Sequence, residues 1–295
     1  MNLCFMGLGT MGKPMALNMA KREDALMVFD ILDKAFDDFS GIKAKTTTSL
    51  PEAAKNDIVF LCLPNSSVVE KVCFGEKGLI AMMQKGAVLV DFSTIKHSTA
   101  LETARKCETA GIRYMDAPVS GMEARAKDGT LTVMCGGSKE LFDELYTYFE
   151  SIGNNIVYMG ANGSGQLAKL INQLLFDINV AALAEILPMA VHMGLDPEKI
   201  GNIINSGTGR SYASEFFIPR ALDGDFSEGY ALQNAYKDLV SAAELGAEEV
   251  IALPILGAAT TTYQMALRKG YAKENKSAMM KVYEELLGVQ FRKKA

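Results

Sequence analysis

The sequence predicts an α/β fold in which an N-terminal, doubly wound parallel sheet is followed by an all-α domain. Short runs rich in Val, Ile, Leu and Phe alternate with helical patterns up to about residue 160. A glycine-rich stretch separates the first apolar run from the first helical pattern, and after residue 163 only helical spacing continues. Such alternation is typical of repeated βαβ units. We therefore expect a sheet domain over residues 1–162 and an all-helical domain over 163–295.

Seven apolar runs predict the strands. They lie at residues 2–6, 26–30, 57–63, 87–92, 112–116, 131–135 and 155–159. The runs at 57–63 and 87–91 are apolar apart from one terminal aspartate each, and they do not alternate with polar residues. This pattern indicates strands that helices cover on both faces of the sheet.

The second half begins with a long predicted helix. Leucine, isoleucine and alanine recur at helical spacing from Leu167 to Ala182. Pro188 should kink this helix and Gly194 should end it, while Asp196 and Pro197 predict the cap and first turn of the next one. No convincing strand follows, and no apolar stretch reaches the length that we require for a membrane span.

Composition argues against a nucleic-acid-binding, a metal-binding and a membrane protein. The net charge is −5, and no cluster of basic residues interleaved with aromatic residues indicates a nucleic-acid partner. The five cysteines show no C-x-x-C spacing, and the two histidines, His97 and His192, are far apart, so we expect reduced thiols and no metal site. The N-terminus lacks a charged region before its apolar run. These features predict a cytoplasmic protein without a membrane partner.

The glycine-rich stretch Gly7-Leu8-Gly9-Thr10-Met11-Gly12 predicts a dinucleotide site of the Rossmann type. Gly7 permits a tight turn, Gly9 lets the backbone approach a pyrophosphate, and Gly12 allows close packing of helix on strand. The helix that follows offers amides and a partial positive charge to the phosphates. A glycine-rich turn without a ligand is the alternative interpretation.

Asp30 ends the second predicted strand, where a carboxylate accepts hydrogen bonds from the adenosine ribose. It would repel a 2′-phosphate, and no arginine follows at residues 31–34, although Lys34 is a nearby cation. The sequence thus predicts NAD as the cofactor, with an ordinary strand-end turn as the alternative role for Asp30.

Four motifs occur in order along the chain: GLGTMGKPMA, DAPVSGMEARAKDGTLTVMCGG from Asp116, GSGQLAKLINQ from Gly163 and YKDL from Tyr236. With them the chain resembles the β-hydroxyacid dehydrogenase family over essentially its whole length. The resemblance implies reversible oxidation of a 3-hydroxy acid to its semialdehyde by a nicotinamide cofactor, without a metal. Members act on 3-hydroxyisobutyrate, 2-(hydroxymethyl)glutarate or tartronate semialdehyde.

The resemblance also implies roles for individual residues. Lys169 matches the family's catalytic lysine, and Lys237 matches a lysine where cofactor and substrate meet. The substrate-binding turn is matched by Ser120, Gly121 and Met122, and the cofactor contacts near the nicotinamide by Leu63, Pro64 and Thr94. Two positions depart from the family pattern, because Met122 and Gln173 stand where glycine and asparagine are usual.

The chemistry of the reaction requires a group that takes the hydroxyl proton and returns it in the reverse direction. Lys169 can do so, and an amine does this best when burial or a neighbouring cation, such as Lys237, disfavours its charged form. Asn172 and Gln173 lie at helical spacing from Lys169 and can orient the substrate carboxylate or carbonyl. Alternatively, both are polar positions that border an apolar stripe.

The stretch SGTGRSYA from Ser206 resembles the corresponding segment of the 2-(hydroxymethyl)glutarate dehydrogenases. It suggests that Arg210 holds a second anionic group of the substrate, with an arginine on a solvated loop as the alternative.

Alternative functions stay open. One is that of a reductase of tartronate semialdehyde or another small semialdehyde acid. Another is that of a non-catalytic dinucleotide-binding interaction module, although Lys169 argues against it. A decarboxylating phosphosugar-acid dehydrogenase and an imine reductase fit less well. The apolar helices predict a homodimer or homotetramer.

Overall fold

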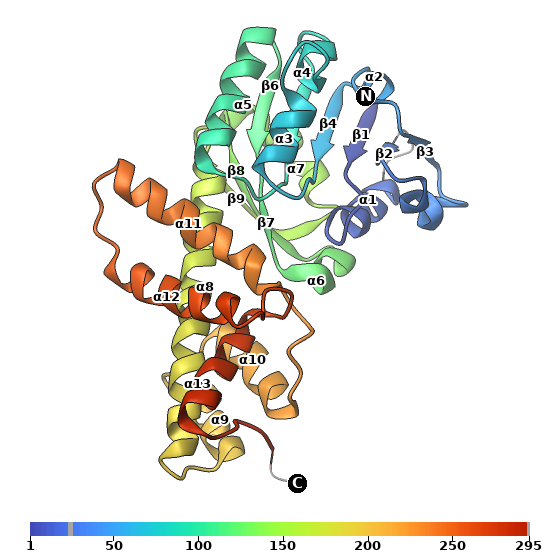
Figure 1. The fold of residues 1–295 in the computed structure, drawn as a ribbon. Helices are drawn as coiled ribbons and strands as arrows, with labels where there is room; N and C mark the ends of the chain where they lie inside the picture. Colours follow the sequence, from blue (N-terminus) through green and yellow to red (C-terminus); the bar gives the residue numbers. More distant parts are fainter. Residues whose placement is uncertain (23–25, 294–295) are drawn as a thin grey trace. The chain divides into compact units, whose positions relative to one another are not determined.

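The computed structural model describes residues 1–22 and 26–293, which divide into two compact units, Met1–Lys169 and Leu170–Ala295 (Figure 1). The elements of the first unit are, in order, β1 (Leu3–Met6), α1 (Gly12–Ala20), β2 (Leu26–Phe29), the 3-10 helix η1 (Asp33–Phe39), β3 (Ala44–Thr47), α2 (Leu50–Ala53), β4 (Ile58–Leu61), α3 (Ser66–Cys73), α4 (Leu79–Met82), β5 (Val88–Asp91), α5 (His97–Ala110), β6 (Arg113–Asp116), β7 (Val119–Ser120), α6 (Met122–Asp128), β8 (Leu131–Gly136), α7 (Lys139–Phe149), β9 (Gly153–Gly160) and the start of α8 (Ser164–His192).

The sheet of the first unit is built on six parallel strands in the order β3-β2-β1-β4-β5-β6. β8 extends it antiparallel to β6 and β7, and β9 pairs parallel with β8. The chain changes direction of winding between β1 and β4, and the carboxyl ends of strands at such a point form the usual ligand crevice of this fold. All seven predicted strands are confirmed, whereas β3 and β7 were not predicted.

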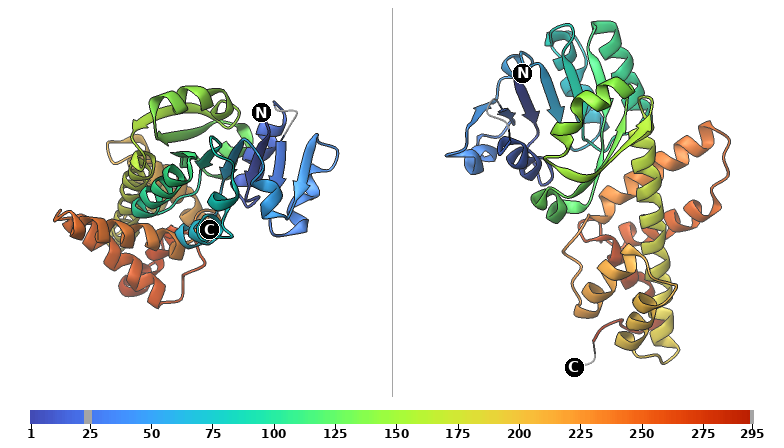
Figure 2. Two further views of the ribbon diagram at one scale, coloured as in Figure 1. Left: turned by 90° about the horizontal axis from the view of Figure 1, so that it is seen from above. Right: turned by 180° about the vertical axis from the view of Figure 1, so that it is seen from behind.

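Two layers of helices enclose the sheet (Figures 1 and 2). Leu3 and Phe5 of β1 pack in one apolar cluster with residues of α1 and α7. Cys4 and Met6 point to the opposite face and pack with residues of α3 and α5. The strands are therefore apolar throughout because both of their faces are buried, which confirms the doubly wound architecture.

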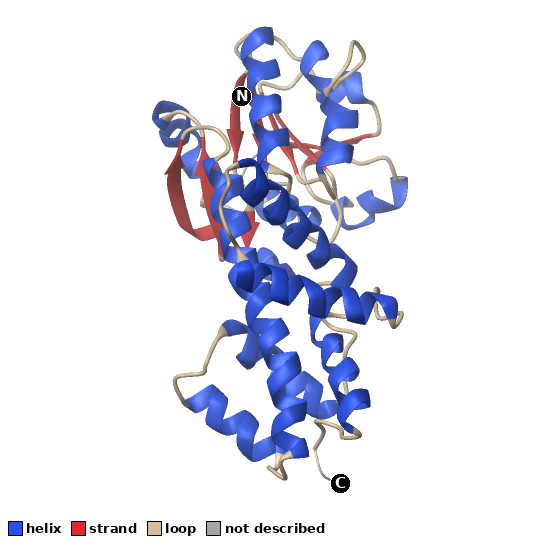
Figure 3. Cartoon of the chain, turned by 60° about the vertical axis from the view of Figure 1, so that its left-hand side comes forward, coloured by secondary structure: helices blue, strands red, loops and turns tan. Residues whose placement is uncertain are grey.

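Among the described residues, the second unit consists of helices and loops apart from an isolated bridge between Ala231 and Asn275 (Figure 3). Its elements are the remainder of α8, α9 (Pro197–Ser206), α10 (Tyr212–Asp223), α11 (Leu232–Glu248), α12 (Pro254–Arg268), the 3-10 helix η2 (Lys276–Met279) and α13 (Met280–Leu287). Pro188 lies inside α8, which ends at His192. The predicted cap is confirmed, because the Asp196 carboxylate accepts from the amides of Glu198 and Lys199.

The division between the units falls at Lys169, later than the predicted boundary at residue 162. The first turns of α8 belong with the sheet because the amides of Gly163 and Gln166 donate to the Asp116 carboxylate at the end of β6. The helix therefore starts in the first unit and continues into the second.

α8 overturns one expectation from the sequence. Its 29 residues are long and apolar enough to cross a membrane by length and composition. The core helix of a soluble protein passes the same test, and one face of α8 packs in the core of the second unit through Val180, Ala184 and Leu187. One of its two acidic residues, Asp177, is buried in an ion pair with Lys276. Burial raises the pKa of Asp177 to about 6, and Lys276 opposes this shift.

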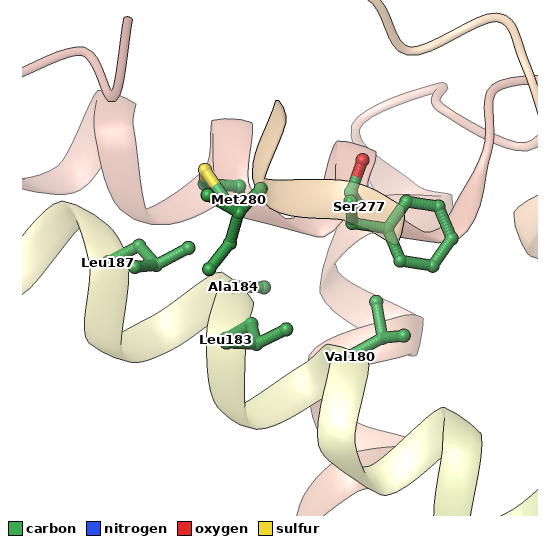
Figure 4. Close-up of a pocket in the computed structure, with 8 residues that line it drawn as sticks. Val180, Leu183, Ala184, Leu187, Ser277 and Met280 are labelled. Carbon is green, nitrogen blue, oxygen red and sulfur yellow. The ribbon is translucent and has the colours of Figure 1, made fainter. Parts of the chain in front are cut away.

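The apolar core of the second unit leaves a narrow crevice beside α8 (Figure 4). Its walls include Val180, Leu183, Ala184 and Leu187 of α8, with Ser277 and Met280 opposite them. Almost all of this lining is apolar, and the crevice has no room for a water molecule. It is consequently a feature of core packing rather than a ligand site.

Candidate active site

The glycine-rich loop between β1 and α1 lies at the carboxyl end of the central strand. Gly7 has φ +94°, which favours glycine, and its amide donates to the Phe29 carbonyl over 2.9 Å. A Cβ on Gly12 would stand 1.9 Å from the Gly7 carbonyl oxygen, so the loop and α1 can approach only because residue 12 is glycine. A Cβ on Gly9 would meet no protein atom within 4 Å. The backbone is thus open at Gly9, which fits a pyrophosphate passing there.

α1 begins directly after this loop, with Thr10 exposed and Met11 half-buried. The first turn of the helix contains no acidic side chain. The positive end of the helix dipole therefore faces a region where an anion is favoured.

Asp30 follows β2 and is half-buried beside the loop. Its carboxylate accepts from the Leu8 amide over 2.8 Å and from the Leu32 amide over 3.0 Å. Each carboxylate oxygen has two lone pairs, so these bonds leave acceptor capacity for ribose hydroxyls. Asp30 consequently orders the loop and still fits the adenosine ribose.

Three further predicted cofactor residues lie after neighbouring strands of the same sheet. Leu63 and Pro64 follow β4, and Thr94 follows β5. The Leu63 amide donates to the Ser93 hydroxyl over 2.8 Å, which links the two loops. Because β2, β1, β4 and β5 are adjacent, the first unit brings all the predicted cofactor residues except Lys237 to one edge of its sheet.

A buried polar network beneath this edge was not predicted. Asp91 at the end of β5 and Asp116 at the end of β6 are both fully buried register partners. Asp91 accepts from the Ser93 amide over 2.8 Å. Burial raises the pKa of Asp91 to about 7 and also raises that of Asp116. An acidic residue that closes an apolar strand was the sequence signal for both.

Lys169 lies one turn beyond Gln166 in α8 and is 7% exposed. A lysine this buried is unusual, because its charged form must lose most of its hydration. Its position is that of a constrained amine rather than of a surface lysine. Among the described residues, no group of three or more histidine, cysteine, aspartate or glutamate side chains could hold a metal ion.

The predicted substrate-binding turn joins β7 to α6, and Met122 is the first residue of α6. Ser120 ends β7, and Gly121 has φ +143°. Met122 has φ +61°, in the left-handed region where a side chain is strained. Glycine adopts a positive φ angle without strain, which explains why glycine is usual at this position of the family pattern.

The remaining predicted residues lie in the second unit. On α8, Asn172 is exposed and Gln173 is half-buried, and on α11, Lys237 is half-buried. Arg210 lies between α9 and α10 with 64% of its side chain exposed, and its Nε is 3.6 Å from Glu215 Oε1. The participation of these four residues in one site with Lys169 stays a prediction.

Two family models match the chain. Residues 2–160 match the model described as the NAD binding domain of 6-phosphogluconate dehydrogenase. Residues 163–283 match the model described as NAD-binding of NADP-dependent 3-hydroxyisobutyrate dehydrogenase.

Known proteins are similar over nearly the full length. The 2-(hydroxymethyl)glutarate dehydrogenase of Eubacterium barkeri is 38% identical over 290 residues, covering 97% of this chain and 95% of that protein. The 2-hydroxy-3-oxopropionate reductase of Escherichia coli is 33% identical over 286 residues, covering 96% and 97%. The structure of Mycobacterium tuberculosis 3-hydroxyisobutyrate dehydrogenase with L-serine has a TM-score of 0.85 and 27% identity, covering 95% of this chain and 98% of that one.

Proposed function

The chain belongs to the β-hydroxyacid dehydrogenase family and is a hydroxyacid dehydrogenase that uses a nicotinamide dinucleotide, and from this premise we propose that Lys169 is its general acid–base. The reaction interconverts a 3-hydroxy acid and its semialdehyde. One observation carries the proposal: Lys169 is a buried amine one helical turn beyond Gln166, whose side chain is bonded to the cofactor loop at residues 93–95.

When bound, a nicotinamide dinucleotide would supply the acceptor or donor of the hydride. The residues of this chain bind and orient the reactants and move the proton. In the oxidation the Lys169 amine accepts the hydroxyl proton, and in the reduction its ammonium returns that proton to the carbonyl oxygen. We propose that Ser120, Gly121 and Asn172 bind the substrate carboxylate, and that Lys237 lies beside the reacting groups. The Gly7–Gly12 loop and Asp30 hold the pyrophosphate and ribose.

The substrate class is tested by initial rates with NAD and NADP for 3-hydroxyisobutyrate, 2-(hydroxymethyl)glutarate and L-serine, and with NADH and NADPH for tartronate semialdehyde. Turnover of at least one of these compounds supports the proposal. We chose them because each occurs in the name of a similar protein, as its substrate or as a bound molecule. Binding of the cofactor without turnover of any of them would instead favour an interaction module. A cytoplasmic location is part of the proposal, since all five cysteines are free thiols.

We further propose that substrates with a second anionic group are preferred. Arg210 supports this because its ion pair with Glu215 is exposed and long, and such pairs contribute little free energy. A substrate carboxylate can therefore replace Glu215 as the partner of the guanidinium. A higher kcat/KM for 3-hydroxyisobutyrate than for 2-(hydroxymethyl)glutarate would contradict this preference.

Replacing Gly9 with alanine is expected to weaken dinucleotide binding by at least about tenfold. The added methyl group meets no protein atom within 4 Å, so the free energy of unfolding should stay nearly unchanged. It does enter the space through which we propose that the pyrophosphate passes. Gly12→Ala is the matched control, because its Cβ would lie 1.9 Å from the Gly7 carbonyl oxygen and stability should fall as well. Titration with NADH and urea unfolding measure both quantities. An unchanged dissociation constant for Gly9→Ala contradicts the proposed site.

Asp30→Asn is expected to narrow a preference for NAD over NADP by about tenfold, because it removes the charge that repels a 2′-phosphate. The asparagine oxygen can still accept from the Leu8 amide, so the glycine-rich loop should keep its order, although the bond from the Leu32 amide is lost. The ratio of kcat/KM for the two cofactors measures the change. Asp33→Asn, at the exposed start of η1, is the control that should leave the ratio as it is. A parent enzyme that prefers NADP contradicts the assignment.

We propose that the protein is a homodimer or homotetramer. α8 supports this because it is apolar on two faces. Its exposed large apolar residues are Ile171, Leu175, Ile186 and Met189, and Met193 follows directly after its end; each is between 48% and 73% exposed. At about 100° per residue they fall within an arc of about 60°. The buried residues Val180, Ala184 and Leu187 point the opposite way. An apolar stripe of this length is typical of a surface that another subunit covers.

Leu175→Glu is accordingly expected to lower the mass of the particle in solution. Leu175 lies inside the stripe and is 62% exposed, so the change should spare the fold while it places a charge in the subunit contact. Leu101→Glu on α5 is the control, since Leu101 is 43% exposed in the first unit. Multi-angle light scattering measures the mass. A monomeric parent at micromolar concentration refutes the proposed assembly.

A further inference from the structure

The side chain of Gln166 is bonded at both ends of its amide. Its Oε1 accepts from the Ile95 amide over 3.1 Å, and its Nε2 donates to the Ser93 carbonyl over 2.7 Å. Gln166 is 2% exposed, so water does not compete for these bonds. The two backbone groups flank Thr94. The amide of Gln166 therefore fixes the loop after β5 at the residue that is proposed to contact the cofactor.

The backbone of the same turn is fixed from the sheet side. Asp116 accepts from the Gly163 amide over 2.7 Å and from the Gln166 amide over 2.9 Å. A Cβ on Gly165 would lie 2.3 Å from the Met134 carbonyl oxygen, so the start of α8 lies directly against β8. The first turn of the helix consequently has one position relative to the ends of β6 and β8.

The loop at residues 93–95, to which Gln166 is hydrogen-bonded, also forms hydrogen bonds with neighbouring segments. Ser93 donates its amide to Asp91 over 2.8 Å, and its hydroxyl accepts from the Leu63 amide over 2.8 Å. Lys169 follows Gln166 by three residues, which is about 4.5 Å along the helix and on a neighbouring side of it. A shift of Gln166 thus moves both the cofactor loop and the base of the Lys169 side chain.

We propose that Gln166 is a positioning residue that sets the place of Lys169 relative to the cofactor loop at residues 93–95. The inference rests on the proposed function of Lys169. Two distant segments must stay in register for proton and hydride to move at adjacent atoms, and a displacement of about 1 Å costs about a hundredfold in rate. An amide is suited to this task because it donates and accepts at once, and it stays uncharged.

Gln166→Met removes both hydrogen bonds and keeps an unbranched side chain of similar length. It is expected to lower kcat about 10- to 100-fold, while the dissociation constant for NADH changes by less than about threefold. The primary deuterium isotope effect on kcat, measured with substrate deuterated at the hydroxyl-bearing carbon, should rise because the chemical step becomes slower. Gln84→Met is the control at an exposed glutamine. If Gln166→Met does not fold, Gln166→Glu replaces it, since the carboxylate of that variant retains an acceptor for the Ile95 amide and loses the donor to the Ser93 carbonyl.

A double-mutant cycle with Lys169→Ala decides the inference. A residue that acts through Lys169 has nothing left to position once the amine is gone, so Gln166→Met should lower kcat only slightly further in that background. An equal fold-loss in both backgrounds, or an unchanged kcat and isotope effect in the parent background, overturns the proposal. Near-normal kcat for Lys169→Ala alone identifies a different failure, that of the proposed function itself.

Discussion

Alanine at position 169 is expected to lower kcat about 10²- to 10⁴-fold, the usual effect of removing a general acid–base group. Lys169 is 7% exposed, and its helix starts against the ends of β6 and β8, so the backbone that carries the amine is held in place. Without it, a water molecule must take the hydroxyl proton. The glycine-rich loop and Asp30 are unchanged in this variant, so the affinity for the dinucleotide should survive.

Two further variants separate proton transfer from charge and packing. Lys169→Arg keeps a cation that does not release its proton, so its kcat should fall nearly as far as that of Lys169→Ala. Lys55→Ala, at an exposed lysine of the first unit, should retain the parent rate. Steady-state kinetics with saturating cofactor, together with NADH titration, measure all three. A kcat for Lys169→Ala within about threefold of the parent, with NADH still bound, would remove Lys169 from the mechanism.

The main elements of the fold could be predicted from the sequence because burial on both faces leaves strands apolar throughout. β4, with its four buried residues Ile58–Leu61, is an example. β3 was not predicted because it is an edge strand in which only Thr47 is buried, so Ala44–Thr47 lacks an apolar pattern. β7 has two residues, too few for any periodicity. The length of α8 as an apolar segment was not predicted, because polar residues interrupt its hydrophobic run. These are the residues near Asn172, and Asp177, which is buried in an ion pair with Lys276.

The cofactor edge of the site was predictable for a different reason. Spacing between Gly7 and Gly12, and the place of Asp30 after the next strand, are local features of the chain. The network of Asp91, Ser93, Asp116 and Gln166 depends on which strands are neighbours. Gln166 is 71 residues beyond Ile95, and no local pattern indicates that their side chain and amide meet.

Asp91 should make the protein less stable as the pH rises from about 4 to about 7. The carboxyl is fully buried, and its Oδ2 has no hydrogen-bond partner among the described residues. Burial raises the pKa of Asp91 from 3.8 to about 7, with a smaller contribution from Asp116 and opposition from the hydrogen bonds of Ser93. The folded protein therefore retains this proton at a pH where the unfolded chain has released it.

The sign of the effect follows from linkage. Below pH 3.8 both states hold the proton, and the stabilising contribution of Asp91 is complete. It is lost progressively as the pH rises, and the loss ends above the folded pKa of about 7. At 1.36 kcal/mol for each pKa unit, the loss amounts to at most about 4 kcal/mol. The raised pKa values of Asp116 and Asp177 act in the same direction, so a variant of Asp91 is needed to isolate its share.

Asp91→Asn replaces the carboxyl with a neutral group whose oxygen can still accept from the Ser93 amide. Its free energy of unfolding relative to the parent should rise between pH 4 and pH 8, because only the parent loses stability through this group. Urea unfolding across that range measures the difference. Asp225→Asn is the control whose difference from the parent should stay nearly constant over this range, since hydrogen bonds from Ser227 lower the pKa of Asp225 below 3.8 and its contribution is lost only as the pH falls below that value. A difference between Asp91→Asn and the parent that stays constant from pH 4 to pH 8 means that Asp91 is ionised in the folded protein throughout, and that its burial is offset by a partner.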